Sequence, residues 1–85
     1  DVRHCFSRTL NATVPGYADD IYQNISLSRC LSICHHCNDC LGDDEPCNST
    51  IYYEEHSECV LLRFSAEKAG HSVAKGEKGA VIYWR

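Results

Sequence analysis

The chain has 85 residues and a formal net charge of −4, which allows one small domain, residues 1–85, and argues against a nucleic-acid-binding surface. No run approaches the roughly 18 apolar residues of a membrane-spanning helix, so we expect no direct membrane insertion of this segment. No leader opens it either, so we expect a mature soluble piece, with any signal or anchor outside it. A domain this small buries only about 60–65% of its unfolded surface. We therefore expect the seven cysteines to act mainly as covalent staples.

The first half of the chain predicts one strand and one helix. Residues 4–10 alternate weakly between apolar and polar side chains, which favours a strand. The Val-Pro-Gly triplet at 14–16 interrupts the pattern, and residues 17–24 are interpreted as a connection. Ser26 is the expected N-cap of a helix near residues 27–37.

Two cysteines lie on the buried face of this helix. Leu27, Cys30, Leu31 and Cys34 follow the i, i+3, i+4, i+7 spacing of one helical face. Side chains four residues apart have Cβ atoms about 5–6 Å apart, whereas a disulfide needs about 3.5–4.5 Å. Cys30 and Cys34 cannot easily bond to each other, so each is expected to reach a different strand of a sheet beneath the helix.

The second half predicts most of that sheet. Residues 38–46 form a polar loop with several turn-forming residues. The β-rich runs 50–53 and 59–64 are separated by a short polar turn and predict a hairpin. Residues 65–78 are polar and contain glycine, which fits a short helix or a loop, and the apolar run 79–84 predicts a strand inside the sheet.

Three Asn-x-Ser/Thr acceptors indicate secretion. They begin at Asn11, Asn24 and Asn48, and none has proline in the middle position. Together with seven cysteines and no methionine, they point to an oxidising compartment. We therefore expect a secreted or extracellular glycoprotein.

Charge is distributed unevenly along the chain. Residues 1–60 carry three basic and ten acidic side chains, whereas residues 61–85 carry five basic and two acidic ones. A polyanion such as a sulfated glycan could bind if the basic residues converge, and the alternative is an ordinary solvated surface. The candidate contacts are Arg63, Lys68, Lys75 and Lys78.

No pattern predicts a cofactor, a metal site or catalysis. The tract of cysteines and histidines at 34–40 could ligate zinc in a reducing compartment, but the glycosylation acceptors argue for an oxidising one. The five histidines follow no motif that supplies a nucleophile with a base, so we expect no enzyme. The neighbouring aromatics Tyr52, Tyr53, Tyr83 and Trp84 fit either a sugar-stacking platform or core packing.

The chain resembles the PAN/Apple superfamily over nearly its whole length. The resemblance rests on the order of a helix with two cysteines, a third cysteine before a β run, a fourth inside the next β run, and a closing strand. The matching residues are Cys30, Cys34, Cys47, Ile51, Tyr52, Tyr53, Glu58, Cys59, Val60 and Leu61. The resemblance implies an α+β fold in which a single helix packs on a four- or five-stranded antiparallel sheet.

The resemblance also implies disulfides from Cys30 to Cys59 and from Cys34 to Cys47. With seven cysteines, at least one has no partner within the chain. Cys5 either has a partner outside this sequence or pairs with Cys37 or Cys40. If Cys5 is the odd cysteine, then Cys37 and Cys40 most simply pair with each other.

The function implied by the resemblance is non-catalytic recognition. Such a module binds an extracellular protein or glycan within a larger secreted, matrix or membrane-attached protein, where it can serve cell adhesion. Two alternatives remain, a glycan or heparin-type lectin and a free-standing secreted inhibitor acting through residues 65–78.

Overall fold

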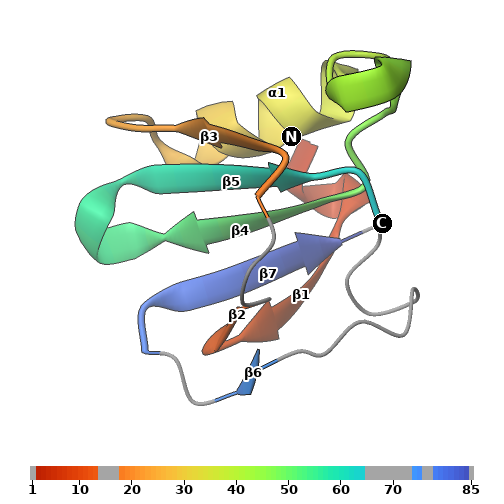
Figure 1. Cartoon of the computed structure of the whole chain (residues 1–85). Coiled ribbons are helices and arrows are strands. Elements are labelled where there is room, and N and C mark those ends of the chain that lie inside the picture. Colours follow the sequence, from red (N-terminus) through yellow and green to blue (C-terminus); the bar gives the residue numbers. More distant parts are fainter. Residues whose placement is uncertain (1, 14–17, 65–73, 76–77, 85) are drawn as a thin grey trace.

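A computed structural model describes residues 2–13, 18–64, 74–75 and 78–84, and one helix packed on an antiparallel sheet dominates it (Figure 1). The five-stranded sheet has the order β1-β7-β4-β5-β3, and a second, two-stranded sheet pairs β2 with β6. The strands of the five-stranded sheet are β1 (Ser7–Leu10), β3 (Asp20–Tyr22), β4 (Ser49–Tyr53), β5 (Glu58–Leu62) and β7 (Ala80–Trp84). The short pair is β2 (Ala12–Thr13) and β6 (Ala74–Lys75). The predicted α+β class is confirmed.

The predicted hairpin and closing strand are both present. β4 and β5 pair antiparallel, and the 3₁₀ turn η3 (Glu54–His56) joins them through Ser57 in the left-handed region. β7 pairs with β1 on one side and with β4 on the other, so it lies inside the sheet as expected.

The helix α1 (Leu27–His36) begins where the sequence predicts. The hydroxyl of Ser26 accepts a hydrogen bond from the backbone N–H of Arg29 at 3.2 Å, which satisfies one donor of the first turn. The helix ends one residue earlier than expected, because Cys37 takes an extended conformation as the C-cap.

Two predictions for the N-terminal part were wrong in detail. Residues 4–10 do not form one strand, because the 3₁₀ turn η1 (Val2–Cys5) precedes β1. The predicted connection at 17–24 contains strand β3, which pairs with β5 at the edge of the sheet. β3 is only three residues long and carries an exposed Ile21, so tertiary pairing rather than its own sequence pattern makes it a strand.

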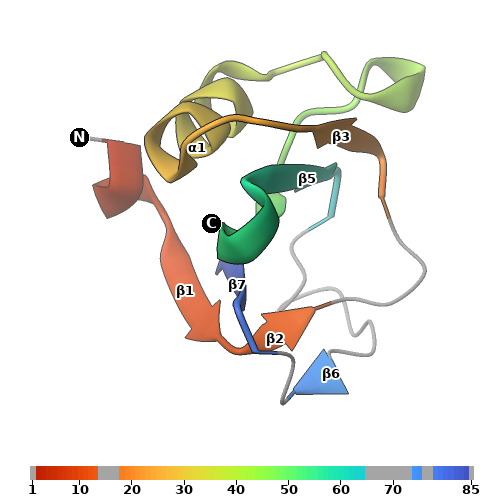
Figure 2. The same ribbon diagram turned by 90° about the vertical axis from the view of Figure 1, so that its left-hand side faces the viewer.

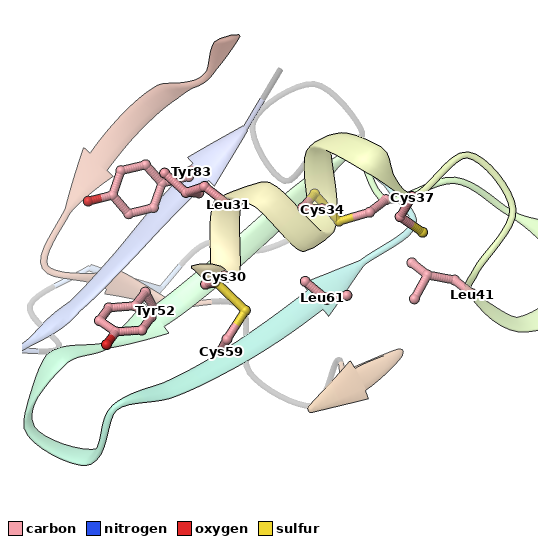
Figure 3. Packing of buried hydrophobic residues seen from close by; sticks show 10 residues of the cluster. Cys30, Leu31, Cys34, Cys37, Leu41, Tyr52, Cys59, Leu61 and Tyr83 are labelled. Atoms are coloured by element: carbon pink, nitrogen blue, oxygen red, sulfur yellow. A yellow bond between two sulfur atoms is a disulfide. The ribbon is translucent and has the colours of Figure 1, made fainter. Parts of the chain in front are cut away.

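The core divides between the two faces of the sheet. The helix-side cluster is centred on the buried side chains Leu31, Leu61, Tyr52 and Tyr83 (Figure 3). The cluster on the opposite face contains Ala12, Ile51, Val60, Leu62, Ala80 and Ile82. This division follows from the alternation of side chains along each strand.

One core residue comes from the predicted polar loop. Leu41 is only 5% exposed and joins the helix-side cluster (Figure 3). It forms an isolated bridge with Glu45 around the short turn η2 (Gly42–Asp44). Leu41 therefore anchors this otherwise polar loop to the core by an apolar contact.

Candidate functional site

The helix leaves one side of the sheet face uncovered. α1 packs on β4, β5 and η1. Within the described part of the chain, β1 pairs only with β7 and lies at the rim of the sheet (Figure 2). Directly opposed residues of antiparallel strands share a face, and Arg8 of β1 is opposite Tyr83 of β7. Because Tyr83 belongs to the helix-side cluster, Arg8 also faces the helix side.

A surface groove lies at this position, with a volume of about 600 Å³. Three separate parts of the chain form it: the η1–β1 segment, the first residue of α1, and β7. The lining residues are His4, Phe6, Ser7, Arg8, Leu27 and Tyr83. We call this the β1 groove.

Among the described residues, Arg8 is the one permanently charged residue in the lining of the β1 groove. Arg8 and His4 are both exposed, and no carboxylate lies among the lining residues. In the part of the chain that the structure describes, Arg8 has no ion pair and no side-chain hydrogen bond. Because its lining has an unpaired arginine and no carboxylate, the groove can bind a negatively charged group, even though the whole chain has a net charge of −4.

An apolar strip continues the groove along β1. Leu10 is 58% exposed, and its partner across the strand pair, Val81, is partly buried against the helix-side cluster. Leu10 lies two residues from Arg8, so both side chains project from the same face of the sheet. The site thus combines a guanidinium with an exposed leucine in one line.

Disulfides hold the helix that forms one wall of this groove. Cys30 of α1 bonds to Cys59 of β5, and Cys34 bonds to Cys47 just before β4 (Figure 3). These are the two pairs that the resemblance implies. All four cysteines are completely buried, so the bridges run through the core between helix and sheet.

Comparison with known protein families shows which family the chain belongs to. A sequence profile described as the PAN domain matches residues 5–84. The chain belongs to the PAN domain family. PAN domains are generally non-catalytic binding modules for proteins or carbohydrates, and this disulfide-rich example suggests an extracellular module. A search of curated proteins finds no match.

Of the three remaining cysteines of this PAN domain, Cys37 is buried in the helix-side cluster, whereas Cys5 and Cys40 are exposed. Cys37 bonds to Cys40 in the turn after α1, and Cys5 is a free, exposed thiol next to the β1 groove. The tract considered for zinc therefore has its cysteines in disulfides. Across the described residues, no three His, Cys, Asp or Glu side chains are placed to hold a metal ion. None of the described helices is long and apolar enough to cross a membrane.

Of the four aromatic residues considered as a sugar platform, two are buried and two are partly buried. Tyr52 and Tyr83 are 6% and 7% exposed on the helix side, whereas Tyr53 and Trp84 pack on the opposite face. The Tyr52 hydroxyl donates to the Ile25 carbonyl at 2.7 Å. Tyr52 and Tyr83 therefore offer little open ring face to a pyranose, whereas Tyr53 and Trp84 are only partly buried.

Among the proposed polyanion contacts, Arg63 is engaged by acidic residues. Its Nε lies 3.5 Å from Asp19, one of its terminal nitrogens lies 3.5 Å from Asp43, and its backbone N–H donates to Asp19 at 2.9 Å. Lys78 is exposed beside β7. Lys68 and the side chain of Lys75 lie outside the described residues.

The three glycosylation acceptors occupy different environments. Asn11 and Asn24 are exposed, and both have positive φ angles, 53° and 59°, as is typical of asparagine in surface turns. Asn48 is partly buried, its side-chain amide donates to the Arg63 carbonyl at 2.8 Å, and Thr50 of the same acceptor is fully buried in β4. Asn11 and Asn24 are thus the more accessible acceptors in the folded domain.

Sequence reasoning missed the β1 groove. Arg8 and Leu10 lie on a strand whose pattern alone predicts nothing about binding, and Leu27 appears in sequence as an ordinary helix residue. The groove exists only because the helix packs over β4 and β5 and leaves β1 at the rim. The available signal in the sequence was Arg8 itself, one of the three basic residues among the ten acidic ones of residues 1–60.

Proposed function

We propose that this PAN domain is a non-catalytic extracellular recognition module that binds a protein partner at the β1 groove. The observation that carries the proposal is a groove of about 600 Å³ whose lining combines apolar side chains with Arg8 and His4, which have no acidic neighbour in the lining. Cationic and apolar groups that converge in a concave site are typical of recognition surfaces.

At the β1 groove, the burial of Tyr83 favours a protein partner over a carbohydrate partner. Tyr83 forms part of the groove lining but is only 7% exposed, so it gives little area for sugar stacking. Arginine, by contrast, is enriched in protein interfaces. The glycosylation acceptors and the disulfides support an interaction outside the cell.

The test is a binding screen of the domain, produced as a multivalent secreted fusion, against an array of extracellular proteins and an array of glycans. The comparison uses Arg8→Glu and the matched control Arg29→Glu, because Arg29 is an exposed helix residue outside the groove. Both variants change the net charge by the same amount. We expect a protein ligand that Arg8→Glu loses and Arg29→Glu keeps, whereas equal binding of both variants contradicts the proposed site.

A further inference from the structure

We propose that the β1 groove accepts an extended acidic segment of the partner protein, which adds to β1 as a further antiparallel strand. This inference rests on the proposed function and adds the conformation and the chemistry of the ligand. It follows from the free edge of the sheet, the register of β1 and the charge of its side chains.

The outer edge of β1 has no partner strand in the described residues. β1 is the terminal strand in the order β1-β7-β4-β5-β3, and among the described residues no strand pairs with its outer side (Figure 2). An edge strand presents backbone N–H and C=O groups that can pair with an extended peptide. The β1 groove lies next to this edge, because Ser7 and Arg8 belong to both.

The register of β1 specifies which guest side chains face the groove. Arg8 and Leu10 both project to the helix side, so the guest residues opposite them are two positions apart on one face. In an antiparallel guest strand, the residue opposite Leu10 precedes the residue opposite Arg8. A carboxylate suits Arg8 and an apolar side chain suits Leu10, which is 58% exposed. The expected guest pattern is therefore apolar-x-acidic.

The opposite edge of the sheet does not offer the same chemistry. β3 is the other terminal strand, but it carries Asp20, whose negative charge would repel an acidic guest. Ile21 of β3 is also exposed, at 49%. Exposed apolar area thus occurs on both edges, and charge directs an acidic strand to β1.

The experiment is an NMR titration of the ¹⁵N-labelled intact domain with the peptide acetyl-Thr-Val-Thr-Glu-Thr-Val-Thr-amide. Two control peptides isolate the two parts of the inference. One replaces Glu by Gln and removes the charge, and the other carries N-methyl groups on alternate residues and blocks strand pairing while it keeps every side chain. A uronic-acid oligosaccharide serves as a carbohydrate probe.

We expect shift changes confined to Ser7–Leu10, Leu27 and Tyr83. Binding should weaken by about 1.4- to fivefold with the Gln peptide, the range expected for loss of one cross-strand charge pair. It should be lost with the N-methylated peptide. Arg8→Glu should prefer a peptide with Lys in place of Glu, whereas Arg29→Glu should behave as the wild type.

Two outcomes would overturn the inference and leave the proposed function intact. Equal binding of the Glu, Gln and N-methylated peptides at the groove would show that neither charge nor strand pairing matters there. No groove shifts with any peptide at millimolar concentration would exclude an added strand, while an Arg8-dependent ligand from the protein array would still support the site. Groove shifts with the oligosaccharide alone would contradict both the inference and the choice of a protein partner.

Discussion

Removal of each disulfide in turn should destabilise the domain, and the loss of stability should increase with the length of the loop that the disulfide closes. The sequence separations are 29 residues for Cys30–Cys59, 13 for Cys34–Cys47 and 3 for Cys37–Cys40. Loop-closure entropy in the unfolded chain then gives about 3.6, about 2.9 and about 1.6 kcal/mol, respectively. Paired substitution by alanine is the perturbation, because it leaves no unpaired thiol.

Two features of the structure modify these values. The loop closed by Cys34–Cys47 lies inside the one closed by Cys30–Cys59, so the first two costs should be closer than the separate values suggest. Those four cysteines are also fully buried, whereas only Cys37 of the third pair is buried and Cys40 is exposed, so truncation adds a larger cavity cost to the two helix bridges. A domain of this length has a total stability of about 4–13 kcal/mol, so loss of a helix bridge removes a large part of it.

The assay is urea unfolding of the three double-alanine variants, followed by circular dichroism. We expect the two variants without a helix bridge to lose about 3 kcal/mol or more, and the variant without Cys37 and Cys40 to lose about half as much. A loss of less than about 1 kcal/mol without the Cys30–Cys59 bridge would refute the reasoning, as would the largest loss from removal of Cys37–Cys40.

Three further predictions concern single residues. Maleimide should label the native, unreduced protein once, at Cys5, and mass spectrometry showing no label or several labels would contradict the free exposed thiol. Made through a secretory pathway, the protein should carry glycan on Asn11 or Asn24 and little on Asn48, and glycopeptide mapping that finds only Asn48 occupied would reverse this order. Burial, and then a neighbouring carboxylate, raises the pKa of Tyr22 above its ordinary 10.0, so the folded state holds this proton more tightly and stability should fall as pH rises past that value. NMR titration of the tyrosine rings and unfolding of Tyr22→Phe measure this contribution, and an unchanged alkaline stability profile in the variant would contradict it.

The fold was largely predictable because its strongest signals are local. The i, i+3, i+4, i+7 stripe and the Ser26 cap specify α1, and the β-rich runs specify β4, β5 and β7. β3 was missed because three residues with an acidic start give no strand pattern, and the pairing with β5 that forms it comes from elsewhere in the chain. Leu41 was missed for a similar reason, since its burial depends on the packing of the loop.

The candidate site was not predictable from sequence, because its parts are far apart along the chain. His4 and Arg8 precede the helix, Leu27 begins it, and Tyr83 lies near the C-terminus. Only the lateral position of α1 on the sheet brings them into one groove. The basic residues that sequence reasoning chose instead include Arg63, which the fold places beside Asp19 and Asp43.

The most direct test of the central claim is the footprint of a natural protein partner, measured by hydrogen–deuterium exchange on the complex. Binding at the β1 groove predicts new protection in Ser7–Leu10, at the start of α1 and in Ala80–Trp84. Protection confined to Glu54–His56 or Gly42–Asp44, with β1 unchanged, would contradict the claim.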